Sequence, residues 1–240
     1  MLNNNFTKEK EIAFLLDGFE ESKEIAEKIK TVFTDWKIRN VFWDEFNENF
    51  FSLEGEKKDF LPFIIDSDLV INLINQDREK FLEIEKKINF VKSFQIQNSF
   101  KTISLFSTSL GTKKVLKARG IKTPVFEKTN NRERKEVFVN FPQPSKVHDG
   151  LIEEKIKGEE FELFIFRNRE GEILCLDTQG GQEIVDFAKS VFDKLGIEKF
   201  ASLKLISSER RGNYVLDVNV DFDVLLKDEA KNLKIMKKAL

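Results

Sequence analysis

The first hundred residues alternate between short apolar runs and helical patterns. Apolar runs at 11–16, 41–46 and 68–74 predict buried strands, and the charged stretch 78–94 predicts a helix. After the first run, apolar residues recur at spacings of one, three and four, which is typical of an amphipathic helix: Ile25, Ala26, Ile29 and Phe33. This order predicts crossover units and a parallel sheet covered by helices.

In the middle of the chain the pattern of apolar and polar residues changes twice. Residues 101–109 (KTISLFSTS) predict a strand or a turn. Residues 112–126 predict a helix that ends at Gly120, because glycine readily adopts the left-handed conformation that closes a helix. The next stretch, 127–149, is polar and holds two of the four prolines, and only residues 136–141 within it are typical of a strand.

The last ninety residues predict antiparallel pairing. Residues 159–168 and 172–178 are two strands joined by a short turn, and residues 182–197 form an amphipathic helix. A second hairpin at 201–219 (ASLKLISSERRGNYVLDVN) and a helix at 228–240 complete the chain. The fold class is therefore α/β, with a parallel N-terminal α/β layer, a small central part and a C-terminal antiparallel α+β layer. Such an architecture implies clefts at the carboxyl ends of the parallel strands and between the later layers.

Composition narrows the class of protein. The chain of 240 residues is 40% hydrophobic and 34% charged, which is typical of a globular protein, and its net charge of −2 with interspersed signs predicts no nucleic-acid partner. The single Cys175 excludes an internal disulfide and a cysteine metal cage. No run approaches the ~18 apolar residues of a membrane span, and the N-terminus lacks a signal-peptide pattern, so we expect a cytoplasmic protein without a membrane partner.

The second hairpin carries the clearest candidate chemistry. Asp217 and Asn219 are two residues apart on one strand, so their side-chain oxygens lie on the same face of the sheet. Two hard oxygen ligands side by side are suited to Mg²⁺. The facing strand offers Ser202 and Lys204, however, and an ammonium is a poor neighbour for a divalent cation. The pattern is compatible with a metal site or with the remnant of one.

Four segments together resemble the D-alanine–D-alanine ligases and other ATP-grasp enzymes. They follow in the order and spacing of that family: EIAFLLDGFEES with DSDLVINLI, SLGTKKVLKARGIKTPVF, LIEEKIKGEEFELFI and GNYVLDVN. The resemblance implies an ATP-grasp-like fold in three parts, an N-terminal α/β domain at 1–111, a truncated central subdomain at 112–165 and a C-terminal subdomain at 166–240.

The resemblance also implies roles for individual residues. Lys113 matches a lysine near the α-phosphate of ATP, Glu153 lies on the strand that contacts the adenine, and Glu160 matches the carboxylate that accepts from the ribose hydroxyls. Asp217 and Asn219 match the terminal metal ligands. These residue types suit the roles, since an ammonium neutralises phosphate and carboxylates accept hydroxyl donors.

The departures from the family pattern concern the phosphate and metal sites. Asn140 stands where the family has a second phosphate-binding lysine, and Pro142 and Pro144 interrupt the loop whose backbone N–H groups hold phosphates. Ser202 and Lys204 replace an arginine and a metal-bridging aspartate. A turn after the metal strand (VDFDVLL) and a loop that carries a catalytic tyrosine (here LDTQGG) also differ. Phosphoryl transfer depends on positioning and charge neutralisation, so these changes make turnover improbable.

Three functional hypotheses follow. The first is a catalytically degenerate relative without catalytic residues or cofactor, which binds an unknown protein partner or itself as a homodimer, with Lys204 paired to Asp217. The second is an active ATP-dependent carboxylate–amine ligase in which Arg210, Arg211 or Lys146 supplies the missing positive charge. The third is a regulator that holds ATP or ADP without turnover through Lys113, Glu153 and Glu160, and ATP and Mg²⁺ are the expected cofactors if nucleotide binding is retained.

Overall fold

The structure is a computed structural model in which two compact units are described separately. One unit comprises Met1–Phe100 with Leu225–Leu240, and the other comprises Lys101–Val224. The described residues are 10–16, 20–43, 51–53, 56–58, 64–73, 84–86, 94–128, 146–148, 151–176 and 180–238. The chain crosses between the two units twice, because its final helix belongs with the first unit.

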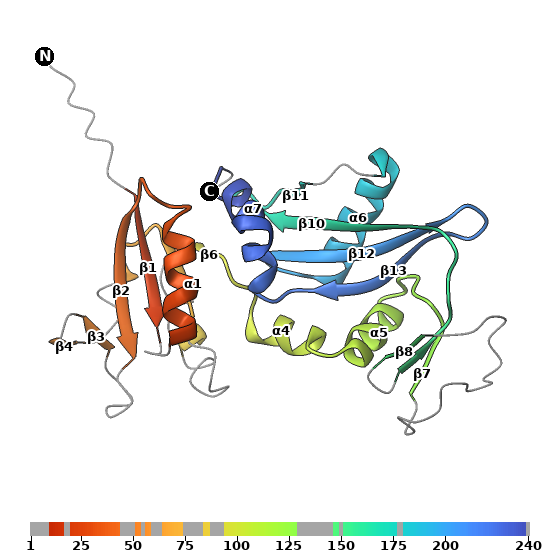
Figure 1. The fold of residues 1–240 in the computed structure, drawn as a ribbon, viewed down its shortest axis with the longest axis horizontal. Helices are drawn as coiled ribbons and strands as arrows, with labels where there is room; N and C mark the ends of the chain where they lie inside the picture. Colours follow the sequence, from red (N-terminus) through yellow and green to blue (C-terminus); the bar gives the residue numbers. More distant parts are fainter. Residues whose placement is uncertain are drawn as a thin grey trace, which may run out of the picture. The chain divides into compact units, whose positions relative to one another are not determined.

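The first unit is built on a six-stranded sheet in the order β4-β3-β2-β1-β5-β6 (Figure 1). Its strands are β1 (Glu11–Leu16), β2 (Lys37–Trp43), β3 (Phe51–Leu53), β4 (Glu56–Lys58), β5 (Leu69–Asn72) and β6 (Phe94–Gln95). Strands β2, β1, β5 and β6 are parallel, as the alternating pattern predicts, and β3 and β4 add an antiparallel edge. Every residue of β1 is buried, because its apolar run lies in the middle of the sheet.

Two long helices belong to the described part of the first unit. Helix α1 (Glu20–Lys30) buries Ala26 and Ile29 and runs beside β1, as its apolar spacing requires. Helix α7 (Asp223–Lys238) is held through Lys237, whose Nζ donates to the carbonyl oxygen of Val32 at 3.0 Å and forms an ion pair with Asp35. The C-terminal end of the chain is therefore anchored to the turn that follows α1.

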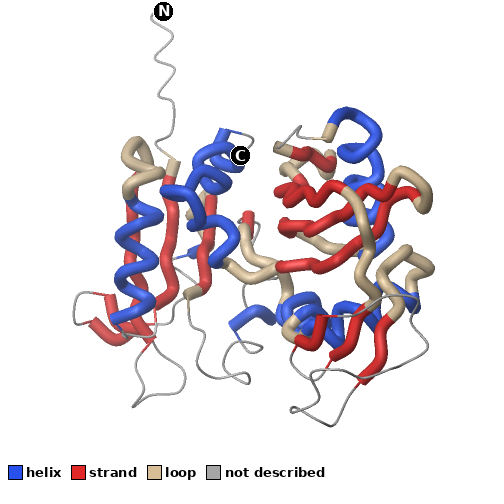
Figure 2. Tube along the Cα trace, turned by 45° about the vertical axis from the view of Figure 1, so that its right-hand side comes forward, coloured by secondary structure: helices blue, strands red, loops and turns tan. Residues whose placement is uncertain are grey.

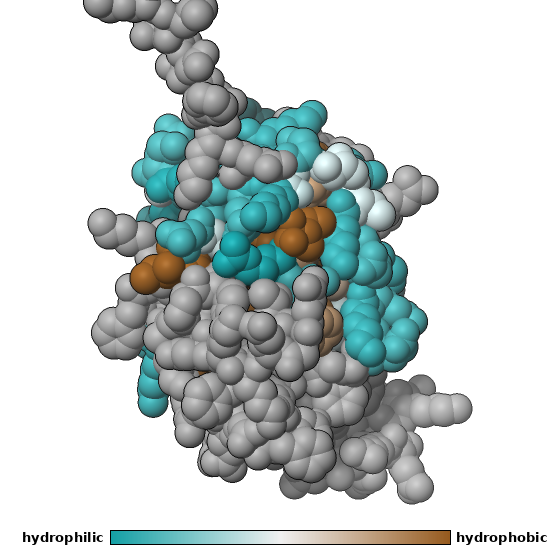
Figure 3. Space-filling view, turned by 90° about the vertical axis from the view of Figure 1, so that its left-hand side faces the viewer, coloured by the Kyte–Doolittle hydropathy of each residue, from teal (hydrophilic) through white to brown (hydrophobic). Residues whose placement is uncertain are grey.

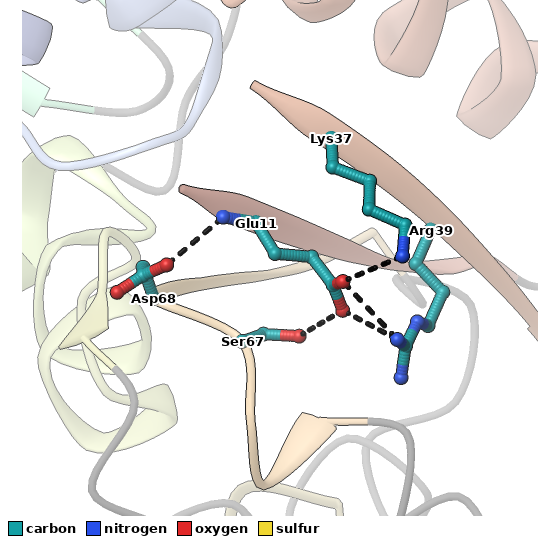
Figure 4. Close-up of polar contacts among 5 residues, drawn as sticks. All are labelled: Glu11, Lys37, Arg39, Ser67 and Asp68. Carbon is teal, nitrogen blue, oxygen red and sulfur yellow. Dashed lines mark hydrogen bonds and ion pairs between the residues drawn. The ribbon is translucent and has the colours of Figure 1, made fainter. Parts of the chain in front are cut away.

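A buried polar cluster closes the amino ends of the parallel strands (Figure 4). The carboxylate of Glu11 lies 2.8 Å from Nη2 of Arg39 and 3.6 Å from Nζ of Lys37, and it accepts from the hydroxyl of Ser67 at 3.4 Å. The backbone N–H of Glu11 donates to Oδ2 of Asp68 at 2.9 Å. Glu11 and Lys37 begin strands, Arg39 lies two residues into β2, and Ser67 and Asp68 precede β5, so the cluster ties together the amino ends of β1, β2 and β5.

The described part of the second unit combines antiparallel sheets with helices (Figure 2). Its four-stranded sheet has the order β11-β10-β12-β13 and its three-stranded sheet the order β7-β9-β8. The strands are β7 (Phe126–Lys128), β8 (Lys146–His148), β9 (Leu151–Glu153), β10 (Glu159–Arg167), β11 (Ile173–Cys175), β12 (Phe200–Ser208) and β13 (Gly212–Asn219), and the helices are α4 (Phe100–Phe106), α5 (Ser109–Ala118) and α6 (Gly181–Leu195). Both predicted hairpins and the helix at 182–197 are confirmed.

The core of this unit lies between α6 and one face of the four-stranded sheet. The alternating apolar residues of β10 and β12 point toward the apolar side of α6, and Leu163 of β10, Leu203 of β12 and Phe192 of α6 have no exposed surface. Gly180 precedes α6 with a φ of 92°, and a Cβ there would lie 2.7 Å from the ring of Phe161. Glycine is required at this position by both conformation and space.

The prediction for residues 101–109 is wrong, because this segment contains helix α4. Thr102 and Phe106, four residues apart, are its buried positions, so a helical period was present beneath the β-branched composition. Residues 136–141 lie outside the described part of the chain, as does most of 78–94. The three-part division at residues 111 and 165 stays a prediction, and the compact units are drawn at residue 100 and residue 224 instead.

The described surface shows few apolar residues. Among the described residues visible in Figure 3, most are hydrophilic and the hydrophobic ones form small separate patches. The exposed large hydrophobic side chains are Ile65, Leu105 and Val125, which are scattered along the sequence. Within the described ranges, no helix combines the length and the apolar character that a membrane span requires.

Candidate functional site

A cavity of about 220 Å³ lies inside the second unit and collects most of the predicted site residues. Lys113, Glu153, Glu160 and Asp217 all line it, although they come from α5, β9, β10 and β13. The remaining lining residues are Ser109, Glu154, Lys155, Ile156, Lys204, Ile206 and Leu216. Asn219, the fifth predicted residue, is not among them. The fold thus brings together four of the five residues that the resemblance selected, although they lie up to about a hundred positions apart in sequence.

Lys113 forms the buried wall of this cavity. It lies in the first half of α5, which begins where the Thr108 hydroxyl accepts from the N–H of Gly111. Only 1% of its side chain is exposed, because Thr112, Lys113 and Leu116 form the inward face of the helix. An isolated buried ammonium would be very costly, so its partners decide whether the charge is tolerated.

Three internal acceptors surround the Lys113 ammonium. Its Nζ lies 3.1 Å from Oε2 of Glu153, 2.6 Å from the carbonyl oxygen of Leu216 and 3.2 Å from Oγ1 of Thr123. An ammonium has three N–H donors, so all of them can be used inside the protein. Burial lowers the pKa of Lys113, while the carboxylates of Glu153 and, more weakly, Asp217 act in the opposite direction.

The carbonyl of Leu216 is available because of a β-bulge. Lys204 pairs with Asp217 but Leu205 pairs with Val215, so Leu216 is an extra residue on β13. Thr123 is fixed in turn, since its hydroxyl donates to the carbonyl oxygen of Val215 at 2.8 Å. The two neutral partners of Lys113, Leu216 and Thr123, were not predicted from the sequence. Thr123 belongs to the quoted GIKTP motif, but no sequence signal marks a carbonyl freed by a bulge.

The predicted register of the second hairpin is confirmed. Ser202 pairs with Asn219 and Lys204 pairs with Asp217, so the four side chains lie on one face. The expected ion pair between Lys204 and Asp217 is wrong, however, because Nζ of Lys204 lies 3.3 Å from Oε2 of Glu160 on the neighbouring strand. Both partners are about half exposed, and the ammonium reaches diagonally across the sheet toward the cavity.

The donor set does not fit a divalent cation. Oδ1 of Asn219 accepts from the backbone N–H of Asp221 at 2.9 Å and so caps the turn after β13. Lys204 stands opposite Asp217, and Glu160 is engaged with it. Within the described part of the chain, no three His, Cys, Asp or Glu side chains lie together as a metal site would require. A Mg²⁺ ion would meet one free carboxylate and an ammonium.

A second charged pair borders the cavity. The buried carboxylate of Glu154 lies 2.5 Å from Nη1 of Arg211, and the guanidinium also lies 5.2 Å from the ring of Tyr214. The hydrogen bond to Arg211 lowers the pKa of Glu154, although burial acts in the opposite direction. Arg211 is therefore engaged in a structural pair. The side chains of Asn140, Pro142, Pro144 and Lys146 lie outside the described part of the chain.

Comparisons by sequence give no match, either to a protein-family model or to a curated protein. Comparisons by structure give clear matches. D-alanine–D-alanine ligase from Bacillus anthracis matches with a TM-score of 0.56 at 12% identity, covering 96% of this chain and 97% of that one. VanG D-Ala:D-Ser ligase from Enterococcus faecalis matches with a TM-score of 0.57 at 13% identity, covering 89% of this chain and 90% of that one.

A third solved structure is N5-carboxyaminoimidazole ribonucleotide synthetase from Thermotoga maritima, with a TM-score of 0.56 at 14% identity over 88% of this chain and 68% of that one. The chain therefore has a D-alanine–D-alanine ligase-like ATP-grasp fold, and the fold class expected from the resemblance is confirmed. Identities of 10–14% describe a distant likeness of fold, and they leave function to be argued from the site.

Proposed function

We propose that this chain is a catalytically degenerate D-alanine–D-alanine ligase-like protein that acts as a binding or assembly module. The observation that carries the proposal is the state of Lys113. Its ammonium is 1% exposed and lies within hydrogen-bonding distance of Glu153, Leu216 and Thr123. To meet a phosphate, it would have to leave three internal partners, one of which is a carboxylate.

Two further features support the absence of turnover. The cavity of about 220 Å³ is by itself smaller than the roughly 300–1,000 Å³ of typical small-molecule pockets, and the wider hollow of about 850 Å³ that shares Glu154 and Lys155 with it does not include Lys113, Glu160 or Asp217. The charges around it are also unfavourable, since Lys204 is paired with Glu160 and Arg211 with Glu154. Of the described cations that line or border the cavity, Lys113, Lys204 and Arg211 are paired, which leaves the exposed Lys155 to meet a triphosphate, whereas phosphoryl transfer needs several charges neutralised.

The test is isothermal titration with ATP, with and without Mg²⁺, together with a phosphate-release assay. The wild type is compared with Glu160→Ala and with Glu170→Ala, a matched control in the exposed turn after β10. We expect no Mg²⁺-dependent heat and no phosphate release. The Bacillus anthracis ligase, of which a structure complexed with ATP is known, serves as the positive control.

A nucleotide-binding regulator is the second candidate. It is favoured by one observation, the meeting of Lys113, Glu153 and Glu160 at a cavity whose apolar lining includes Ile206 and Leu216. Micromolar binding without Mg²⁺ that is lost in Glu160→Ala and kept in Glu170→Ala would establish this alternative. Binding strengthened by Mg²⁺ with release of phosphate would instead establish an active carboxylate–amine ligase and overturn the first proposal.

A further inference from the structure

Two consecutive carboxylates mark the point where β9 ends. Glu153 is the last residue of β9, and Glu154 follows it. Successive side chains of an extended chain point to opposite sides, so the two carboxylates reach different partners. The carboxylate of Glu153 lies 3.1 Å from Nζ of Lys113 on α5, and that of Glu154 lies 2.5 Å from Nη1 of Arg211, in the turn between β12 and β13. We call these two ion pairs the Glu153–Glu154 clamp.

Backbone hydrogen bonds beside the clamp join the segments that border the three-stranded sheet. The segment before β7 and the segment after β9 are paired, because the N–H of Glu154 donates to the carbonyl oxygen of Val125 at 2.8 Å. The segment before β7 is also bonded to the four-stranded sheet, since the N–H of Val215 donates to the carbonyl oxygen of Lys122 at 2.9 Å. The clamp therefore lies where the three-stranded sheet is attached to the rest of the unit.

The described apolar cluster beside the clamp is small. Ile156, Ile206 and Tyr214 form this buried cluster, and Leu216 packs against it. The other face of the four-stranded sheet packs on α6 and carries the much larger core of this unit. Regions with few buried apolar contacts open locally at a lower free energy than a large core does. The attachment of the segment after β9 therefore depends strongly on the two ion pairs.

The cavity of about 220 Å³ is lined by both of the parts that the clamp joins. Residues 153–156 supply one part of its lining, and the four-stranded sheet supplies another through Glu160, Lys204, Ile206 and Asp217. Only 5% of the Glu154 side chain and 22% of the Glu153 side chain are exposed, so separating either ion pair leaves a buried or partly buried charge without its partner. The cavity can widen between these parts only when the ion pairs break.

We propose that the Glu153–Glu154 clamp is an autoinhibitory contact that keeps the cavity closed to ligands from solution. When both ion pairs break, the segment after β9 moves away from the four-stranded sheet, and the cavity opens while the core beneath α6 stays folded. The inference goes beyond the proposed function, because it concerns when the cavity is accessible and not what the protein binds. Ion pairs that only stabilise the whole unit would not open the cavity separately from the core.

The experiment measures how fast a cysteine in the cavity reacts with N-ethylmaleimide. The full chain carries C175S, so that the introduced cysteine is its only thiol. The cavity probe is I206C, at a position that is 3% exposed in the wild type. The core probe is V191C, at a position that is 2% exposed and lies in the core beneath α6.

Each probe is combined with the intact clamp, with a clamp variant and with a control variant. The clamp variant is E153Q/E154Q, which keeps the shape of both side chains and removes their charge. The matched control is E159Q/E170Q, which removes two exposed carboxylates of the same unit. Circular dichroism of each variant verifies that the fold is intact.

We expect E153Q/E154Q to raise the labelling rate of the cavity probe by about tenfold or more, and that of the core probe by less than about twofold, since only local opening becomes easier. The control E159Q/E170Q is expected to change either rate by less than about twofold, because exposed carboxylates contribute little. An unchanged rate at the cavity probe, or equal increases at both probes, would overturn the inference.

R211Q tests the clamp from its other side. It removes the ion pair of Glu154 and leaves that of Glu153 in place, so we expect a smaller rise at the cavity probe, about threefold, with the core probe unchanged. If E153Q/E154Q does not fold, this variant decides, and the absence of a rise at the cavity probe contradicts the inference. The assay contains no nucleotide, so its failure leaves the proposed function standing, and ATP turnover would overturn that function alone.

Discussion

Glu11 and Lys113 are both charged side chains taken out of water, one in each unit, but they are compensated differently. The carboxylate of Glu11 has two cations and a hydroxyl around it, at the amino ends of parallel strands. The ammonium of Lys113 has one carboxylate and two neutral oxygens, on the wall of a cavity. Glu11 thus has two positive charges beside its one negative charge, whereas Lys113 has a single carboxylate beside its one positive charge.

This difference separates a cluster that holds strands together from one to which the resemblance assigns a function. Removing a partner of Glu11 leaves others in place, and its cations reach the surface. Burial lowers the pKa of Lys113, and the neighbouring carboxylate of Glu153 acts in the opposite direction. The lysine that the resemblance assigns to phosphate binding lies on α5 and contacts Glu153 of β9 and the Leu216 carbonyl of β13. The roles of the two clusters can be compared by measuring how much each contributes to the free energy of unfolding.

The largest effect is expected from Lys113→Met. The change leaves the carboxylate of Glu153 and the carbonyl of Leu216 without their partner, and loss of one member of a buried pair costs about 3 kcal/mol. Urea unfolding followed by far-UV circular dichroism measures the change, with Lys114→Ser as an exposed control on the same helix. A variant as stable as the wild type would mean that Lys113 is free to leave its partners.

A smaller effect is expected from Glu11→Gln, which keeps the shape and removes the charge. Arg39 and Lys37 can recover part of their hydration, so we expect a loss of about 1.5 kcal/mol, the size of a charged hydrogen bond. Both tryptophans, Trp36 and Trp43, lie in the first unit, so their fluorescence reports its unfolding. If Glu11→Gln lost more stability than Lys113→Met, Lys113 rather than Glu11 would be the better compensated of the two buried charges.

Glu154→Gln tests how much the Glu154–Arg211 pair beside the cavity contributes to stability at different pH values. The pKa of Glu154 in the folded state lies below its ordinary value of 4.5, because Arg211 bonds to the ionised form. This stabilisation is complete above pH 4.5 and is lost as the pH falls through the lowered pKa. We expect urea midpoints of the wild type to fall more steeply than those of Glu154→Gln below pH 4.5, with Glu170→Gln following the wild type. Parallel acid profiles for all three would show that the pair contributes nothing.

The smallest effect is expected from Lys204→Met. Its pair with Glu160 is about half exposed on both sides, and such pairs contribute about 0.5 kcal/mol or less. Urea unfolding at low and high salt checks this value, since screening should remove most of the difference. A change above about 1 kcal/mol would indicate that the ammonium is a structural counter-ion of the cavity.

Periodicity along the chain predicted most elements, because apolar faces have to match either a helix or a strand. It failed at α4, where the buried positions Thr102 and Phe106 are too few to outweigh a β-branched composition. The register of Asp217 against Lys204 was predicted, since hairpin pairing is local. The partners of Lys113 were not, because a bulge at Leu216 and the approach of Thr123 arise only in the folded chain.

The return of the final helix to the first unit has a consequence for the order in which the protein is made. Residues 101–224 are contiguous, so the second unit is fully synthesised while the first still lacks residues 225–240. Domains fold as units as they leave the ribosome. The first unit, although it begins the chain, must therefore wait for Lys237 to reach Asp35 and Val32. Completion runs in the opposite order to synthesis.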